Sequence, residues 1–375
     1  MMKKVLIIGG GIAGLTLALS LKKLGIPVVV HEKYDHYQNQ QTGFLIWSYA
    51  IKILQDLGIP VDEVGAPLES FQIHGRKGRF VCEMPIGSVS RLHGANSYEI
   101  NRYRLSELLS RMVGDDLILG SECISVSSLE EKAIATFADG SSDQGDILIA
   151  CDGSNSVVRM FIHPGVQLRM LGSGGWISVI NQRPPLLPLN TQMEFWQPGV
   201  KAGVADLGHG ETRWYVAFKN YIPSAVESKK DQIFNRMKPL PEMIKSCLEC
   251  TDEDQMVPTQ AGDLLALSPW YRDRVLMIGD AAHATSPYAG MGACSAIADA
   301  AFLADLIGSG RSIPAIFQDF QAVRKHAADS VIKESRRGLD LSTCGDLKGW
   351  VRDWMFRNMP EKKWNQIMTD KVTGH

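Results

Sequence analysis

A glycine-rich turn near the start of the chain constrains the fold more than any other feature. The sequence Gly-Gly-Gly-Ile-Ala-Gly at residues 9–14 follows directly after an apolar run at residues 5–8. An alanine- and leucine-rich stretch at residues 15–24 comes next, and a second apolar run at residues 28–30 leads to Glu32. This order is typical of a strand, a tight turn, a helix and a second strand, which together begin a dinucleotide-binding unit.

The three spaced glycines have distinct tasks in such a unit. Gly9 permits the tight turn, Gly11 lets the backbone approach a pyrophosphate, and Gly14 allows the helix and the strand to pack closely. The N–H groups that begin the helix face the phosphates, and the carboxylate of Glu32 accepts hydrogen bonds from a ribose. We therefore expect a dinucleotide to be bound by Gly9, Gly11, Ile12, Ala13, Gly14, Glu32 and Lys33.

Length and charge restrict the class of protein. The 375 residues exceed one typical domain, and a net charge of −2 provides no basic field for nucleic acid. No stretch reaches the roughly 20 apolar residues of a membrane span. The basic start at residues 1–4 imitates a secretory signal, but a signal peptide would leave the spaced glycines and Glu32 unexplained. We expect a cytoplasmic monomer or homodimer that binds small molecules, with no nucleic acid and no stable membrane insertion.

The cysteines predict neither disulfides nor a metal site. Seven cysteines, an odd number scattered through a long chain, are typical of reduced thiols. Cys247 and Cys250 form a Cys-x-x-Cys pair, but no second pair or nearby histidine completes a zinc site. We interpret this pair as one turn of a helix.

Two further segments place polar residues at the ends of apolar strands. The run at residues 146–151 delivers Asp152-Gly153 at its carboxyl end, where open α/β sheets hold ligands, although an ordinary strand-to-turn Asp-Gly remains the alternative. A strand at residues 275–278 leads to Gly279-Asp280, and Pro287, Gly290 and Gly292 then open a helix of small residues. The N-terminal amides of that helix suit an electron-rich carbonyl or a developing anion.

Together the three segments resemble the flavin-dependent aromatic hydroxylases, the group-A flavoprotein monooxygenases typified by 4-hydroxybenzoate hydroxylase. The resemblance extends from residue 1 to about residue 337 and implies an α/β fold. A Rossmann-like FAD-binding domain would comprise residues 1–70, 100–170 and 265–337. An inserted antiparallel β-sheet substrate domain would comprise residues 71–99 and 171–264, followed by a C-terminal helical segment at 338–375.

The resemblance also implies which residues bind FAD. Arg102 matches the family's Arg-x-x-Leu element, Asp152 with Arg159 matches its Asp-Gly motif for FAD and pyridine nucleotide, and Asp280 matches the ribitol and phosphate contact. The start of the last helix would direct backbone N–H groups at the pyrimidine end of the flavin. The residues there are Pro287, Gly290, Met291, Gly292 and Ala293.

The chain departs from the usual family pattern at three positions. Gln41 stands where many members have arginine, Met291 replaces a common glutamine, and Cys294 replaces a common asparagine. We expect the first difference to alter how the flavin moves or how the nicotinamide is received. We expect the other two to make the environment of the flavin edge less polar than usual.

Alternating segments at residues 175–179, 191–196 and 213–218 predict the inserted sheet, and strands within residues 71–83 are expected to join it. Because neighbouring strand residues point to opposite faces, only one of Trp214 and Tyr215 can face a substrate, and the sequence leaves open which. Trp176 and Trp196 are interpreted as core residues. Helices are expected at residues 316–335 and 347–364. The candidate substrate pocket consists of Phe44, Ile46, Trp214, Tyr215, Pro287 and Tyr288.

No protein side chain is identified as the catalytic group. His283 is interpreted as structural, and no nucleophile elbow surrounds Ser286. The resemblance implies an FAD-dependent monooxygenase that uses NADH or NADPH and O2. It would hydroxylate an electron-rich aromatic or heteroaromatic small molecule through a flavin C4a-hydroperoxide.

Three alternatives stay open on the same scaffold: a flavin-dependent halogenase, an isoprenoid reductase, and a flavin-binding protein without turnover. Halogenases usually carry Trp-x-Trp-x-Ile, and the segment at residues 176–180 lacks the second tryptophan.

Overall fold

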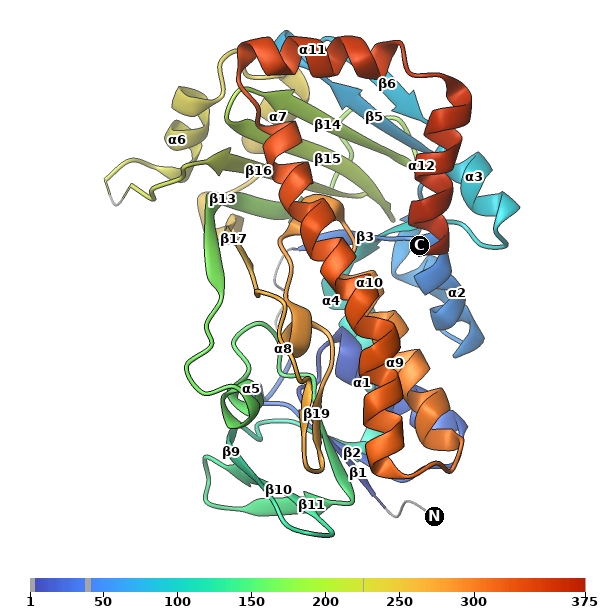
Figure 1. Cartoon of the computed structure of the whole chain (residues 1–375). Helices are drawn as coiled ribbons and strands as arrows, with labels where there is room; N and C mark the ends of the chain where they lie inside the picture. The colour runs from blue at the N-terminus through green and yellow to red at the C-terminus, as the bar shows by residue number, and fades with distance from the viewer. Residues whose placement is uncertain (1–3, 38–41, 225, 375) are drawn as a thin grey trace.

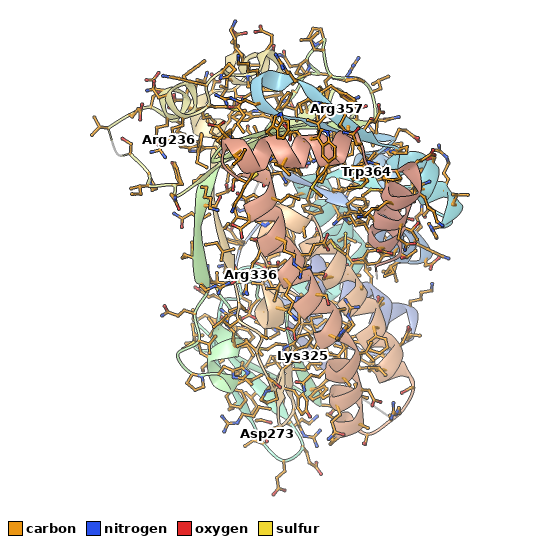
Figure 2. All side chains as sticks on the ribbon, turned by 45° about the horizontal axis from the view of Figure 1, so that its top comes forward. Arg236, Asp273, Lys325, Arg336, Arg357 and Trp364 are labelled. Carbon is orange, nitrogen blue, oxygen red and sulfur yellow. The ribbon has the colours of Figure 1, made fainter. Side chains whose placement is uncertain are left out.

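The computed structural model describes residues 4–37, 42–224 and 226–374. Two large sheets lie at opposite ends of an elongated molecule, and the long helix α10 (Ile313–Ser342) runs between them along one side (Figure 1). Arg336 fixes α10 to the seven-stranded sheet, which lies at the top of Figure 1. The Arg336 Nε donates a hydrogen bond to Asp263 Oδ2 over 2.6 Å (Figure 2 labels Arg336). Among the described residues, no helix is long and apolar enough to cross a membrane.

The six-stranded sheet carries the glycine-rich turn. Its order is β18-β19-β12-β1-β2-β8, and every pair is parallel except β18 with β19. The central strands are buried apolar runs, as expected for a parallel sheet covered on both faces. The strands are β1 (Val5–Ile8), β2 (Val28–His31), β8 (Leu117–Ile118), β12 (Ile147–Ala150), β18 (Tyr271–Arg272) and β19 (Val275–Met277).

Helices pack around this sheet, with α1 (Ile12–Lys23) in contact with both α4 (Arg102–Val113) and α9 (Gly292–Gly308). Residues 13–21 of α1 are buried on every side of the helix, because α1 lies beneath the other helices. Two three-stranded sheets complete this part of the molecule. One comprises β9 (Cys123–Ser128), β10 (Ala133–Phe137) and β11 (Ser142–Gly145), and the other β3 (Gly43–Ile46), β4 (Gly65–Pro67) and β7 (Tyr98–Asn101).

The seven-stranded sheet has the order β17-β13-β16-β15-β14-β5-β6, so strands from residues 71–83 do join it as predicted. All pairs are antiparallel except β5 with β14, which are parallel because β5 enters from a much earlier part of the chain. The strands are β5 (Ser70–His74), β6 (Phe80–Met84), β13 (Arg169–Ile180), β14 (Thr191–Gln197), β15 (Val200–Gly208), β16 (Glu211–Lys219) and β17 (Val257–Asp263).

The helical tail differs from its predicted bounds. Helix α10 is longer than the predicted 316–335, and the predicted helix at 347–364 is two helices, α11 (Asp346–Arg357) and α12 (Glu361–Thr373). They separate at Pro360, which cannot donate a hydrogen bond inside a helix. The fold-class prediction is confirmed. The other helices are α2 (Ser48–Asp56), α3 (Ile86–Leu92), α5 (Val157–Ile162), α6 (Lys229–Arg236), α7 (Glu242–Glu249) and α8 (Asp280–His283), with short 3-10 turns that include η2 (Arg76–Gly78) and η5 (Pro287–Ala289).

Candidate cofactor and substrate site

The glycine turn between β1 and α1 has the geometry that a dinucleotide requires. Gly9 has φ +105°, and a Cβ there would lie 2.4 Å from the carbonyl oxygen of Cys151. A Cβ on Gly14 would lie 2.0 Å from the carbonyl oxygen of Gly9. Gly11 is exposed, and a Cβ there would meet nothing within 4 Å. Gly9 and Gly14 are thus required by the backbone itself, whereas Gly11 opens on a surface next to the uncapped start of α1.

Glu32, at the end of β2, is tied to this turn. Its Oε2 accepts a hydrogen bond from the backbone N–H of Gly10 over 2.6 Å, and its Oε1 accepts one from Tyr34 over 3.1 Å. The Tyr37 hydroxyl donates to the carbonyl of Gly10 over 2.7 Å. The adjacent Lys33 is exposed, with its ammonium 4.9 Å from the centre of the Tyr34 ring.

Asp280 is influenced electrostatically by Arg102, although the two residues are far apart in the sequence. Asp280 starts α8 after Gly279, whose φ of +56° turns the chain at the end of β19. It is exposed to solvent, and the positive charges of His283, Arg102 and Arg159 act on its carboxylate. A carboxylate can accept hydrogen bonds from hydroxyl groups, and guanidinium groups in the same region of the protein can bind phosphate.

Asp152 makes contacts within the chain. Its carboxylate accepts hydrogen bonds from the Ser156 hydroxyl over 2.6 Å and the Val158 backbone over 3.1 Å, and so caps α5. Burial raises the pKa of Asp152. Arg159 donates to the carbonyl of Ala281 over 3.2 Å, which links α5 to the segment after Asp280. A direct contact of Asp152 with a cofactor stays a prediction.

The segment from Pro287 to Ala293 forms the edge where the resemblance places the flavin. Pro287 is exposed, and Gly290 has φ +64°. Helix α9 begins after Met291 without a side-chain cap, so its first N–H groups, which include those of Gly292 and Ala293, have no partner from a capping side chain. The indole of Trp47 donates to the carbonyl of Gly290 over 3.1 Å and fixes the loop.

Two of the departures from the family pattern are buried, and the third, Gln41, lies outside the described residues. Met291 is buried in the main hydrophobic core. The Cys294 sulfur accepts a hydrogen bond from the Trp47 backbone over 3.3 Å. Burial raises the pKa of the Cys294 thiol to about 12, so the thiol is neutral at physiological pH.

His283 is part of a buried tether. Its Nε2 lies 2.6 Å from Asp299 Oδ2, and Asp299 also accepts from Arg324 Nε over 2.7 Å and from the Gly279 backbone over 2.9 Å. Burial alone would raise the pKa of Asp299, but His283 and Arg324 lower it to about 2. Burial lowers the pKa of His283, but Asp299 more than reverses this and raises it overall. These contacts hold α8, α9 and α10 together.

The two faces of the seven-stranded sheet differ in chemistry. We call the face that packs against η5 the inner face, and the face that packs against α7 the outer face. Trp214 is fully buried in the hydrophobic cluster of the outer face, and its indole donates to Thr251 over 2.9 Å. Tyr215 therefore points to the inner face, toward η5. The structure thus settles the alternation that the sequence left open, and Trp214 no longer belongs to the candidate pocket.

Ile46 is a second correction. It is fully buried in the core and offers no surface to a ligand, whereas Phe44 on the same strand is half-buried. Trp176 belongs to the outer cluster, as expected for a core residue.

A buried polar group occupies the inner face around Tyr215. The Glu194 carboxylate accepts a short hydrogen bond from the Tyr215 hydroxyl, one from the Trp196 indole over 2.7 Å, and one from Gln192 over 3.3 Å. The Lys201 ammonium lies 2.9 Å from Glu194 Oε1, and both side chains are almost completely buried. Burial, together with Glu194, raises the pKa of Tyr215 well above its ordinary value.

This inner-face group reaches the loop that carries the predicted flavin contacts. The Lys201 ammonium lies 5.4 Å from the centre of the Tyr288 ring, and the Tyr288 hydroxyl lies 2.5 Å from Ser173 Oγ. A second buried ion pair adjoins the group, because Arg213 Nη2 donates to both oxygens of Glu99 over 3.0 and 2.9 Å. The Arg213 guanidinium also lies 5.4 Å from the centre of the Tyr215 ring.

Sequence reasoning missed Glu194, Lys201, Arg213 and Glu99. A signal was present, since each is a charged residue within an alternating or apolar strand.

Two surface cavities lie elsewhere. One of ≈ 320 Å³ includes Trp176 and Tyr221 in its lining, and one of ≈ 460 Å³ includes Tyr103 and Arg104. Neither contains a predicted cofactor residue.

The described residues contain no group of three or more His, Cys, Asp or Glu side chains that could hold a metal ion. The seven cysteines are free thiols, and Cys247 lies in α7 with Cys250 at its end, as the helix-turn interpretation predicts.

Comparison with known proteins agrees with this geometry. The profile of the FAD binding domain family matches residues 2–335. The chain belongs to the FAD binding domain family. The uncapped start of α1 above the exposed Gly11, with Glu32 tied to the same turn through Gly10, fits FAD, the group that gives this family its name.

Relatives cover nearly the whole chain. The aurachin C monooxygenase/isomerase of Stigmatella aurantiaca is 29% identical over 364 residues, which are 95% of this chain and 94% of the relative. An FAD-dependent urate hydroxylase of Mycolicibacterium vanbaalenii is 25% identical over 92% of this chain and 89% of its own. The fold matches that of Klebsiella pneumoniae HpxO complexed with FAD and uric acid, with a TM-score of 0.92 at 22% identity over 99% of this chain and 97% of that one.

The predicted resemblance to flavoprotein monooxygenases is confirmed, and the relatives identify this member of the FAD binding domain family as an oxidoreductase.

Proposed function

We propose that this flavoprotein hydroxylates an electron-rich nitrogen heterocycle or phenol that carries an exchangeable ring proton, with NADH or NADPH as reductant. The observation that carries this proposal is the buried Glu194, Lys201 and Tyr215 group, which faces Tyr288 on the loop of predicted flavin contacts. The relatives support the substrate class, because urate is a nitrogen heterocycle with acidic ring protons.

FAD bound at the candidate cofactor site would accept electrons from the nicotinamide and activate dioxygen. In our proposal the residues of the glycine turn hold the pyrophosphate, Glu32 holds the adenosine ribose, and Asp280 with Arg102 holds the ribitol and phosphate region. The first N–H groups of α9 would stabilise negative charge on the flavin ring. The reaction then balances as RH + O2 + NAD(P)H + H⁺ giving ROH + NAD(P)⁺ + H2O. A cytoplasmic location would supply both nucleotides.

The inner-face group would raise the electron density of the substrate ring. An ammonium has three donors, and Lys201 directs one of them to Glu194, so the others can stabilise a substrate that has lost its ring proton. Because the pKa of Tyr215 is raised, its hydroxyl stays protonated and neutral. It can therefore form hydrogen bonds but carries no charge. A ring anion is a better nucleophile toward an electrophilic oxygen than the neutral ring. The proposed roles are therefore charge stabilisation by Lys201 and positioning by Tyr215.

The experiment measures NADH and NADPH oxidation and oxygen uptake with a panel of phenols, quinolines and purines, followed by mass spectrometry of the product formed under isotopically labelled oxygen. Lys201→Met is expected to lower kcat/KM by about tenfold or more, the scale of one lost charged hydrogen bond, and to move the pH optimum upward. Trp214→Phe is the matched control, since it changes a neighbouring strand on the outer face. Equal activity of the Lys201 variant and the control would refute the proposed pocket.

The same assay separates two of the three alternatives. Nicotinamide oxidation that no aromatic compound stimulates would indicate a flavin-binding protein without turnover. A product that contains halide and no labelled oxygen would indicate a halogenase.

A further inference from the structure

Helix α11 is fixed to the protein by one narrow face. Arg352 is buried, with its guanidinium 5.0 Å from the centre of the Trp196 ring, and it donates to the carbonyl of Leu341 over 2.9 Å. The Phe356 ring lies 5.8 Å from Trp196 and 5.3 Å from Trp364, measured between ring centres. The orientation of α11 about its axis is therefore set by side chains packed beneath it.

The opposite face of α11 is apolar and exposed. The spacing of its residues is i, i+3, i+4, i+7 and i+8, which makes one continuous stripe along the helix. The exposed fractions are 77% for Leu347, 68% for Trp350, 41% for Val351, 56% for Trp354 and 51% for Met355. We call these five residues the α11 face. A contiguous apolar patch of this kind marks an interaction site rather than ordinary surface.

Basic residues surround the α11 face. Lys348 and Arg357 flank the stripe on either side of the helix, and Lys362 and Lys363 begin α12. The neighbouring segment 76–80 runs alongside, because Arg76 pairs with Asp346 over 2.8 Å and Arg357 donates to the carbonyl of Phe80 over 3.5 Å. Exposed charged residues in segments 76–80 and 346–363 comprise seven basic and two acidic side chains, although the whole chain has a net charge of −2.

The position of α11 allows a flat surface to reach it. Figure 1 shows α11 lying across the end of the molecule farthest from the N-terminus. Figure 2 brings this end forward, with α11 across the front and Arg357 labelled beside it. A plane could thus contact the α11 face along its full length.

We propose that the α11 face docks reversibly on an anionic lipid surface, with the helix parallel to the membrane. Tryptophan favours the boundary between headgroups and hydrocarbon, and basic residues beside an apolar stripe attract anionic headgroups. A second copy of this chain fits the face poorly. A two-fold contact through α11 would place the basic flanks of one copy against those of the other. Docking at the interface requires no membrane-spanning helix and does not depend on the proposed substrate.

The test is flotation of the FAD-loaded protein with vesicles of phosphatidylcholine alone and of phosphatidylcholine mixed with phosphatidylglycerol. We expect binding to the mixed vesicles, a blue shift of tryptophan emission, and release by salt. The double variant Trp350→Ser, Trp354→Ser should lose binding. A matched control, Ile124→Ser with Leu129→Ser, changes two exposed apolar residues of the distant β9–β10 hairpin and should bind as the wild type does.

The charges are tested separately. Lys348→Glu with Arg357→Glu should weaken binding at least about 25-fold, since each basic residue near an anionic surface contributes roughly fivefold. All of these positions are exposed, and retained FAD absorbance verifies the fold. Equal binding to both vesicle types, or unchanged binding by the tryptophan variant, would overturn the proposal. A third result would also overturn the proposal: the wild type binds no lipid but sediments as a dimer, and the tryptophan variant sediments as a monomer. The α11 face would then bind a second copy of the chain.

Discussion

Replacement of Asp299 by asparagine tests the buried tether beneath the cofactor site. Asp299 is inaccessible to solvent and accepts hydrogen bonds from His283, Arg324 and the backbone of Gly279. Asparagine removes the negative charge and leaves the side chains of His283 and Arg324 without a negatively charged partner. Breaking a buried pair by removing one partner costs about 3–5 kcal/mol in the free energy of unfolding. Because Gly279 precedes Asp280, we also expect weaker FAD binding.

The pH dependence gives a second measure of the same tether. Displacement of the Asp299 pKa from 3.8 to about 2 corresponds to about 2 kcal/mol of stability, present above pH 4 and lost as the pH falls through the folded pKa. The pKa of His283 is raised, so its contribution is complete below its unfolded value of 6.5 and is lost as the pH rises through the folded pKa. The stability difference between wild type and Asp299→Asn should therefore be largest between about pH 4 and 6.

Urea unfolding of the FAD-loaded protein across this pH range measures both effects. Asp329→Asn is the control, since Asp329 pairs with Lys325 one turn away on α10 over 2.7 Å and is half-buried (Figure 2 labels Lys325). That pair should contribute only about 0.3–0.5 kcal/mol. If the two asparagine variants unfold at the same urea concentration, the tether does not stabilise the fold as we have argued.

Three further changes probe the cofactor site. Asp280→Ala should weaken FAD binding by about 1.5–3 kcal/mol in a fluorescence titration, with Asp273→Ala, on an exposed turn, as the unaffected control. Gly14→Ala should prevent folding or FAD loading, because its Cβ would lie 2.0 Å from the Gly9 oxygen, whereas Gly345→Ala, with nothing within 4 Å, should yield normal holoprotein. A Cβ at Gly292 would make only an ordinary 3.5 Å contact with Thr285, and Gly292→Val should lower the flavin potential and slow reduction by moving the ring away from the α9 amides. A normal potential in a Gly292→Val holoprotein would place the flavin ring elsewhere.

The sequence by itself determined the features that depend on short-range spacing. The positions of Gly9, Gly11 and Gly14 between two apolar strands predicted the turn, and the structure reproduces its tight contacts. The sequence also predicted the alternating strands of the inserted sheet, because the two-residue period of a strand follows from the backbone alone.

Only the tertiary structure decided which face of an element lies inside. Alternation states that Trp214 and Tyr215 point in opposite directions, but the direction of each depends on α7 and η5, which pack on the two sides of the sheet. The charges of Glu194 and Lys201 within their strands were visible in the sequence, but their ion pair was not, since the two residues lie on different strands. Helix α11 is the clearest case. Its stripe of leucine, tryptophan and methionine has helical spacing that would ordinarily predict the buried side, but Arg352 and Phe356 pack on Trp196 and turn the stripe outward. Local pattern fixes the period of an element, whereas its orientation depends on the side chains that distant segments bring against it.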